Sequence, residues 1–242
     1  MNRNILYKST EIESYYSKNR INWSEFYPSE KNVLEYSKLN KNNRILDIGC
    51  GCGGLGIALK QRFGITDYTG IDINKNAIKK AIELNPKGKF IADDFLNISK
   101  DIFKKKDIII SLSCIDWNIE FFLMLEKVWS LLDFGKFILS IRLTNEETIN
   151  DLKSSYQFIN FSGLKEGEIA PYNIYNFQNL LENFRALSNI SSIYAYGYNG
   201  KPSNTAVTKL EEVCFAVFSL SKNPSFSGKL KENILLPKEF II

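Results

Sequence analysis

The chain has 242 residues, enough to bury a sizeable core in one domain without requiring two. Hydrophobic residues make up 44% of it and charged residues 24%, which excludes a wholly disordered chain. The net charge of +4 neither requires nor excludes an anionic partner, and the basic residues are scattered rather than gathered into a stripe, so we expect no nucleic-acid partner.

Two residue types limit the chemistry. Histidine is absent, which excludes mechanisms that depend on a histidine base, on a histidine that orients a nucleophile, or on a histidine metal ligand. Cys50 and Cys52 are separated by one residue, which is not a zinc spacing, and no second pair follows. We therefore expect reduced thiols and no metal.

The sequence shows no targeting or membrane segment. Its first residues are polar, and no apolar run approaches the length of a spanning helix. We expect a cytoplasmic protein without a membrane span, and the oligomeric state stays open.

Residues 1–43 precede the first predicted strand. Helical spacing covers 11–19 and 29–39, and Ser29 is a plausible N-cap for the second helix. Aromatic residues, among them Tyr15 and Tyr16, cluster between the two helices. Such clusters more often serve packing than recognition. Their place ahead of the first strand also allows this segment to fold over a site as a helical cover.

The sequence around residues 44–56, RILDIGCGCGGLG, reads as a strand, a glycine-rich turn and the start of a helix. The apolar run at 45–48 is typical of a parallel strand buried on both faces. Glycine tolerates positive φ and lets a ligand lie against bare backbone. Amides at the start of the following helix would point at that ligand. We interpret the turn as a nucleotide-binding loop, against the alternative of a plain turn.

Two readings of this loop compete. Gly49, Gly51 and Gly54 fit the dinucleotide fingerprint, whereas Asp47-x-Gly49-x-Gly51-x-Gly53 resembles the first motif of the class I S-adenosylmethionine-dependent methyltransferases. Asp47 decides between them, because a carboxylate suits the ammonium and sulfonium of S-adenosylmethionine better than a pyrophosphate. A turn-capping role for Asp47 remains the structural alternative. Cys50 belongs to the same loop.

The second strand, 67–73, ends in Asp72 and Ile73. Asp72 lies nineteen residues after Gly53, close to the spacing at which an acidic residue meets ribose hydroxyls. Its two acceptor oxygens match two hydroxyl donors. The alternative is an N-cap for the helix at 74–84. Ile73 would flank the adenine.

Two further strands end in candidate cofactor residues. Strand 88–92 is followed by Asp93, Asp94 and Phe95, and the methyltransferase resemblance places Asp94 on the adenine amino group and the Phe95 amide on a ring nitrogen. Asp93 is expected to be a solvated neighbour. Strand 107–112 ends near Ser111 and Ser113, which the resemblance places beside the methionine part of the cofactor.

Residues after the fourth strand face the acceptor in this family, which makes Asp116 and Trp117 candidates on the substrate side. An apolar helix at 121–132 leads to a fifth strand, 136–143, in which Arg142 lies near the ligand-binding carboxyl edge. An arginine is rarely buried without a partner. A salt bridge to Asp116 or Glu146 and the binding of an anion are equally good interpretations.

The C-terminal half lacks such clear motifs. Segment 144–176 carries Tyr172 and Tyr175 among polar residues and is longer than an ordinary connection, which favours a substrate lid. Helical spacing returns at 177–187. Strands at 190–198 and 212–222 are predicted as an antiparallel pair at the sheet edge, joined by a polar, mobile loop at 200–210. The tail, 223–242, carries no signal.

The four strand-end signals occur in the order of a class I S-adenosylmethionine-dependent methyltransferase of the small-molecule type. This resemblance implies an α/β, Rossmann-like fold with a seven-stranded, mostly parallel sheet, an antiparallel edge strand and helices on both faces. The methyltransferase domain would span 44–222, between the N-terminal cover and the tail. The implied cofactor is S-adenosylmethionine.

The motif typical of many amino-group methyltransferases, Asn/Asp/Ser-Pro-Pro-Tyr, is missing, so we expect O-methylation of a small polar or anionic metabolite. A sugar or a phosphorylated intermediate, for example of surface-polysaccharide synthesis, would fit. Asp116 is the candidate catalytic base, with a tyrosine such as Tyr172 or a glutamate as alternatives. No base is needed if the acceptor is already anionic and held by Arg142. Trp117, Tyr172 and Tyr175 would complete the substrate site. The alternatives are an RNA or protein methyltransferase, a nicotinamide-dependent oxidoreductase, or a cofactor-binding subunit without catalysis.

Overall fold

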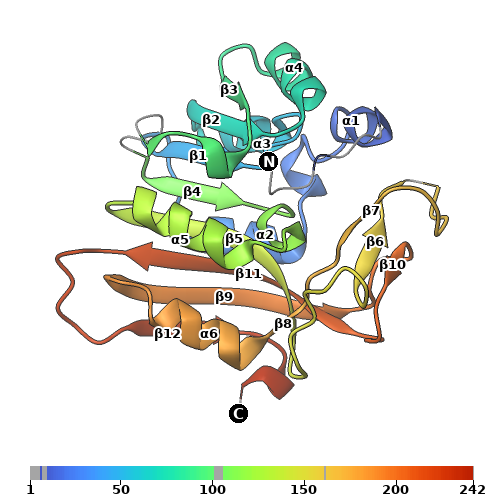
Figure 1. Ribbon diagram of the computed structural model, residues 1–242. Coiled ribbons are helices and arrows are strands. Elements are labelled where there is room, and N and C mark those ends of the chain that lie inside the picture. Colours follow the sequence, from blue (N-terminus) through green and yellow to red (C-terminus); the bar gives the residue numbers. More distant parts are fainter. Residues whose placement is uncertain (1–5, 7–9, 101–105, 161, 242) are drawn as a thin grey trace.

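The computed structural model describes residue 6 and residues 10–100, 106–160 and 162–241. Parts of the expected N-terminal cover, residues 1–5 and 7–9, and the last residue of the expected tail lie outside this range. The molecule is built on one large twisted sheet with a small second sheet beside one end of it (Figure 1).

The large sheet has the strand order β12-β9-β11-β5-β4-β1-β2-β3, with the short strand β8 also paired to β5. From β3 to β5 all neighbouring strands are parallel. The bounds are β1 Arg44–Ile48, β2 Asp67–Asp72, β3 Lys89–Ala92, β4 Ile108–Ser111, β5 Gly135–Thr144, β8 Tyr175–Asn176, β9 Ile190–Gly200, β11 Val213–Lys222 and β12 Lys231–Leu235.

Helices cover both faces of this sheet (Figure 1). One hydrophobic cluster joins the strands to α5 (Phe121–Leu131) and α6 (Phe177–Arg185), and a second joins them to α2 (Pro28–Tyr36) and α3 (Gly54–Phe63). The other helices are α1 Thr10–Tyr16 and α4 Lys75–Leu84, with short 3-10 turns η1 Trp23–Glu25, η2 Phe95–Asn97, η4 Ile115–Trp117 and η5 Lys238–Phe240. Burial on both faces explains why β1 and β4 are nearly continuous apolar runs.

The predicted fold class is confirmed, although the large sheet has nine strands within the described residues rather than the seven expected. The predicted helices and long strands end within three residues of the observed ones. The place of the antiparallel strand differs from the expectation. Strand β11 is antiparallel to both neighbours, but it lies between β5 and β9 rather than at the edge. Its near-continuous burial reflects this interior position.

The edge is formed by β12, which pairs in parallel with β9. This strand comes from the segment that the sequence left without a structural prediction. After it, Leu236 and Phe240 are buried against the core that α6 covers, and the Phe240 ring packs edge-on against Phe177 at 5.8 Å. The C-terminal tail is therefore an integral part of the sheet and its core.

The second sheet is formed by β6 Tyr156–Phe158, β7 Ile169–Pro171 and β10 Ala206–Val207, in the order β10-β6-β7. Strands β6 and β7 belong to the expected lid, and β10 belongs to the loop that was expected to be mobile. Pairing with β6 holds that loop in place, which its polar sequence did not indicate.

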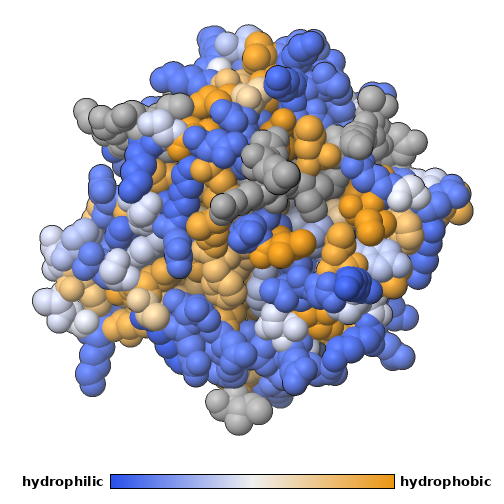
Figure 2. Space-filling view, in the orientation of Figure 1, coloured by the Kyte–Doolittle hydropathy of each residue, from blue (hydrophilic) through white to orange (hydrophobic). Residues whose placement is uncertain are grey.

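No helix within the described ranges is long and apolar enough to cross a membrane. Figure 2 shows hydrophilic side chains around the rim of one face and hydrophobic ones gathered toward its middle.

Removing the Phe240 side chain tests whether the tail stabilises the fold. Replacing a buried phenylalanine by alanine costs about 3 kcal/mol or more, so Phe240→Ala should lower the Tm by about 5–10 °C in thermal unfolding. Phe134→Ala is the matched control because this ring is 66% exposed. Equal Tm values for the two variants would contradict a structural role for the tail.

Candidate active site

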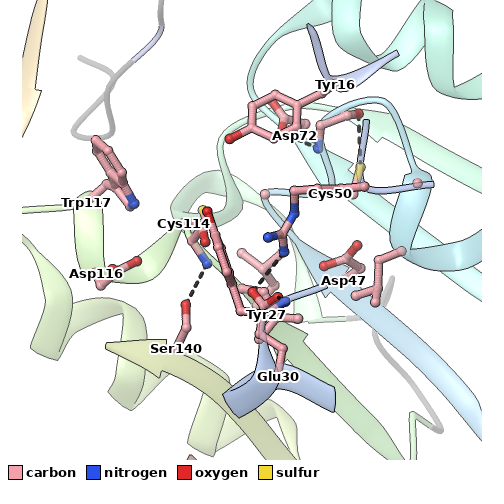
Figure 3. Close-up of a pocket in the computed structure, with 18 of the residues that line it drawn as sticks. Tyr16, Tyr27, Glu30, Asp47, Cys50, Asp72, Cys114, Asp116, Trp117 and Ser140 are labelled. Atoms are coloured by element: carbon pink, nitrogen blue, oxygen red, sulfur yellow. Dashed lines mark hydrogen bonds and ion pairs between the residues drawn. The ribbon is translucent and has the colours of Figure 1, made fainter. Parts of the chain in front are cut away.

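A cavity of about 740 Å³ lies at the carboxyl ends of the central strands. The turns after β1, β2, β3 and β4 and the end of β5 form its floor, the segment that follows α1 forms one wall, and the small sheet forms another. Figure 3 shows Asp116 and Trp117 on one side of it and Asp47 and Asp72 on the other.

The glycine turn after β1 forms part of the floor. Gly49, Gly51 and Gly53 have φ values of +74°, +52° and +76°, a region that glycine adopts without strain. A Cβ on Gly49 would lie 2.2 Å from the Cys114 sulfur, whereas a Cβ on Gly51 would meet no atom within 4 Å. Gly51 thus presents bare backbone to open space in the cavity, as the sequence predicted for a ligand-binding loop.

Asp72 fixes this turn. Its Oδ2 accepts a hydrogen bond from the Gly51 amide at 2.8 Å, and its Oδ1 accepts one from the Asn74 amide at 2.8 Å. Burial raises the pKa of its carboxyl. The helix cap that was the alternative role for Asp72 is made by Asn74, whose side chain accepts the Asn76 and Ala77 amides. Asp72 and Ile73 both line the cavity.

Asp47 is a buried carboxylate inside β1. It is 3% exposed, lines the cavity, and accepts a hydrogen bond from the Tyr68 hydroxyl on β2. Burial is the largest cause that raises its pKa, to about 7, and the nearby Arg20 guanidinium opposes this shift. A carboxylate in this position attracts a cation that enters the cavity.

Asp93 and Phe95 line the cavity after β3. Asp94 is buried, and its carboxylate accepts the Leu96 amide as the N-cap of η2. The sequence placed Asp94 on the ligand and Asp93 in solvent. In this structure Asp93 is exposed, as expected, and also borders the cavity, whereas Asp94 does not line it.

Three other predicted residues do not line the cavity. The hydroxyl of Ser111 is buried, donates to the Ile48 carbonyl at 3.2 Å and accepts the Ile115 amide at 3.3 Å, so it holds β4 to β1. Tyr175 packs against the rings of Phe121 and Phe122. Gly53 is the residue that precedes α3. The lining does include Ser113, Cys50 and Tyr172.

The acceptor side of the cavity is built around Arg142. Its guanidinium pairs with Asp116 Oδ2 at 3.2 Å, and it donates to the carbonyls of Asp116 and Asn173, at 3.0 Å each. The guanidinium carbon lies 4.8 Å from the ring centre of Trp117 and 4.0 Å from that of Tyr172. Of the two interpretations of Arg142, the structure shows the ion pair with Asp116. Glu146 instead lies 3.6 Å from Lys209.

Buried polar atoms next to this ion pair have no hydrogen-bond partner within the described part of the chain. Asp116 Oδ1 and Trp117 Nε1 are buried and make no hydrogen bond with any described residue. Burial raises the pKa of Asp116, and Arg142 opposes that shift. A buried acceptor and a buried donor on adjacent residues could each pair with a ligand, which would remove the cost of leaving them unpaired.

The segment after α1 contributes to the cavity, although no sequence motif marked its residues as part of the site. The Arg20 guanidinium binds Glu30 at 2.8 Å and lies over the rings of Phe26 and Tyr27, at 4.8 and 5.2 Å. A Cβ on Gly54 would lie 2.2 Å from the Arg20 carbonyl oxygen, so this segment rests directly on the start of α3. The aromatic cluster of 15–27 indicated a cover, but no pattern indicated Arg20.

The cavity thiols are not poised for nucleophilic chemistry. Burial raises the pKa of Cys50 and Cys114 well above the usual thiol range and that of Cys52 to about 11. All three therefore stay protonated at neutral pH. Within the described part of the chain, no group of three Cys, Asp or Glu residues could hold a metal ion.

Comparison with known proteins gives the class. A family model described as "Methyltransferase domain" matches residues 39–185. Protein 235L of Invertebrate iridescent virus 6, which is named as a methyltransferase, is 31% identical over 156 residues, 61% of this chain and 57% of its own length. The U6 snRNA methylphosphate capping enzyme Amus of Drosophila melanogaster is 31% identical over 81 residues, 33% of this chain and 27% of its own. The chain thus spans less than two thirds of each of these curated relatives.

Solved structures share the fold at low sequence identity. Phosphoethanolamine N-methyltransferase 2 of Haemonchus contortus, solved with phosphomonomethylethanolamine and S-adenosylhomocysteine, has a TM-score of 0.61 at 14% identity, over 89% of this chain and 58% of that one. Coclaurine N-methyltransferase, solved with S-adenosylhomocysteine, has a TM-score of 0.59 at 12% identity, over 79% and 70%.

The fold of this chain, with its glycine turn after β1, is that of the class I S-adenosylmethionine-dependent methyltransferases. The chain belongs to the methyltransferase-domain family. The sequence prediction of this family, which rested on the order of the strand-end signals, is confirmed.

Because the pKa of Asp47 is raised, the stability of the fold should depend on pH. Its carboxyl ionises near pH 3.8 when unfolded and near 7 when folded, so the stability it gives at low pH is lost as the pH rises across that window. Asp47→Asn removes this cost and keeps an acceptor for Tyr68. It should raise the Tm by several degrees at pH 8 and by less at pH 5, measured by thermal unfolding without ligand. A Tm difference that does not grow with pH would contradict the buried charge.

Proposed function

We propose that this protein binds S-adenosylmethionine in the cavity and transfers its methyl group to a hydroxyl oxygen of a small polar metabolite. Membership of the methyltransferase family supports the reaction class. The observation that carries the choice of acceptor is the buried Asp116 carboxylate, which has one oxygen in an ion pair and the other without a partner.

The floor of the cavity fits the cofactor. Gly51 leaves the space that a side chain would fill, and Asp47 supplies a negative charge for the ammonium group. Each oxygen of Asp72 accepts one amide and keeps a second lone pair for a ribose hydroxyl. Ile73 and Phe95 line the cavity, and we assign them to the adenine. The bound cofactor would supply an electrophilic methyl group on a sulfonium.

Arg20 adds a positive charge to this end. It lies within electrostatic reach of Asp47, whose pKa it lowers, and it lines the cavity. A methionine group carries an ammonium and a carboxylate on the same carbon. The hydrogen bond that Arg20 donates to Glu30 uses one terminal nitrogen, so the guanidinium has further N–H groups for a second carboxylate. Asp47 and Arg20 together match the two charges of the methionine group, so we assign the carboxylate of the cofactor to Arg20.

The acceptor end favours a neutral hydroxyl over an anion. Arg142 donates hydrogen bonds to backbone carbonyls through its Nε and one terminal nitrogen, and the Asp116 carboxylate neutralises its charge. A phosphate or carboxylate at this place would be repelled by Asp116. A hydroxyl, such as that of a sugar, can donate to Asp116 Oδ1 and accept from Trp117 Nε1.

Asp116 can then take the proton that the hydroxyl loses. Burial raises its pKa and strengthens it as a base, while Arg142 holds the carboxylate in one orientation. The Tyr172 ring also packs against the Arg142 guanidinium, at 4.0 Å, and helps to keep it in place. The rest of the chain's work is alignment and the exclusion of water.

The alternatives in other classes have less support. A nicotinamide-dependent oxidoreductase is disfavoured because the family model that matches is that of a methyltransferase domain. One relative is named as an enzyme of U6 snRNA, but the match covers 33% of this chain. An RNA acceptor predicts binding that weakens steeply with salt, which a titration at two salt concentrations measures.

Cofactor binding is measured directly by calorimetry and by thermal shift. S-adenosylmethionine and S-adenosylhomocysteine at 100 times their Kd should stabilise the fold by about 2.7 kcal/mol. Gly51→Ala places a methyl group into the cavity at positive φ and should weaken binding of both. Gly163→Ala is the matched control, because this glycine also has positive φ and open space but does not line the cavity. Absence of binding, or binding of NAD instead, would refute the proposal.

The role of Asp116 separates catalysis from binding. With a hydroxylated acceptor found by screening methyl transfer to sugars and related alcohols, Asp116→Asn should lower kcat by about 10²–10⁴-fold, because general base catalysis contributes that much. Its Kd for S-adenosylhomocysteine should stay within about twofold of the wild type.

Two comparisons complete this test. Asp133→Asn, at an exposed acid after α5, should leave both values unchanged. Thermal unfolding of Asp116→Asn reports the cost of leaving Arg142 unpaired, which is expected to lower the Tm. Normal turnover in a folded Asp116→Asn protein would eliminate Asp116 as the base.

A further inference from the structure

The phenol of Tyr68 is buried beneath the cofactor end of the cavity. Tyr68 lies on β2, opposite Ile45 of β1, and is 3% exposed. Its hydroxyl donates a hydrogen bond to the Asp47 carboxylate, which lines the cavity. Tyr68 itself does not line the cavity, so it can act on a ligand only through Asp47.

Gly56 makes room for this ring. A Cβ on Gly56 would lie 2.8–2.9 Å from carbons of the Tyr68 ring, too close for real atoms. Gly56 lies inside α3, where glycine is a poor helix former and alanine the best. Its φ is not positive, so backbone strain does not require a glycine there. The close approach of the Tyr68 ring is the feature that explains it.

We propose that Tyr68 is a positioning residue, which holds Asp47 ionised and in one orientation toward the positively charged cofactor, and that Gly56 is required to admit its ring. The inference rests on the proposed function, since it assumes that the cation bound at Asp47 is S-adenosylmethionine. It adds to that function a residue that never touches the ligand and sets how strongly the ligand is held.

The hydrogen bond from Tyr68 matters because it is one of the few interactions that favour the ionised form of Asp47. Burial raises the pKa of Asp47 to about 7, and Asp72 adds to this shift, whereas the Tyr68 hydrogen bond and Arg20 lower the pKa. The thiols of Cys50 and Cys114 also lie within electrostatic reach of Asp47, and both stay protonated.

Tyr68 remains a donor under all these conditions. Burial and the neighbouring Asp47 raise the pKa of Tyr68 well above its usual range, so the proton stays on the phenol. Without that donor, Asp47 would keep its burial and lose the hydrogen bond that favours its charged form.

The test is a calorimetric titration of S-adenosylmethionine into wild type and Tyr68→Phe between pH 6 and pH 9. The ratio of the two Kd values cancels the titration of the cofactor's own amino group, which is the same in both experiments. We expect Tyr68→Phe to weaken binding about tenfold at pH 6.5, because hydrogen bonds to charged groups are worth that much, and less at pH 9, where Asp47 is ionised in both proteins.

Two further variants control for loss of packing. Tyr194→Phe removes another buried tyrosine hydroxyl, which donates to Asn32 at 2.7 Å and does not line the cavity, and it should leave the Kd unchanged at every pH. Gly56→Ala should displace the Tyr68 ring and weaken binding with the same pH dependence, although alanine favours the helix. It carries the test by itself if Tyr68→Phe does not fold.

The outcomes are distinct. A Kd ratio that is larger at pH 6.5 than at pH 9 supports the proposal. An unchanged Kd, or a ratio that is the same at all pH values, overturns it and leaves Tyr68 as a packing residue. A wild-type protein that binds no S-adenosylmethionine refutes the proposed function instead, and the stability of the two proteins without ligand still reports the hydrogen bond.

Discussion

The hydrogen bonds that fasten the glycine turn to β2 are the constraint on which the site depends. The amides of Gly49 and Cys50 donate to the Ile71 carbonyl, at 2.8 and 3.0 Å, and the Gly51 amide donates to Asp72. A turn in which every second residue is a glycine has great conformational freedom in the unfolded chain. Because β2 takes up these amides, the turn is rigid, and Gly51 faces the cavity as bare backbone.

The same arrangement concentrates negative charge where it is costly. Asp47 and Asp72 are both largely withdrawn from solvent, and burial raises the pKa of each. Hydrogen bonds from Tyr68 and from two backbone amides offset part of that cost. A cation placed beside these carboxylates would offset the remaining cost, so the two acids favour a positively charged ligand.

The sequence predicted the site residues that lie at a fixed spacing from the glycines, but not those that tertiary packing brings to the site. Asp47 and Asp72 stand at fixed offsets from the glycines, and both line the cavity. Asp94 stands at a fixed offset too, but a one-residue choice between neighbouring acids depends on turn geometry that spacing does not encode. Arg20 enters the site from a segment far earlier in the chain, through packing against Gly54, and no periodicity marks it. Strand β12 was hidden because an edge strand of five mostly exposed residues lacks the apolar alternation that marks buried strands.

The two ends of the cavity differ in charge, and this difference gives the bound donor a direction. Near the glycine turn the acids outnumber Arg20, whose charge is shared with Glu30. At the other end Arg142 and Asp116 neutralise each other, and aromatic rings cover the pair. In the proposed reaction, a cationic donor would be drawn to the first end, while a neutral acceptor would meet no competing charge at the second. Asp116 Oδ1 is the buried oxygen of that pair that has no partner. A proton that binds there would weaken the ion pair with Arg142, so the proton must leave again for the pair to be restored.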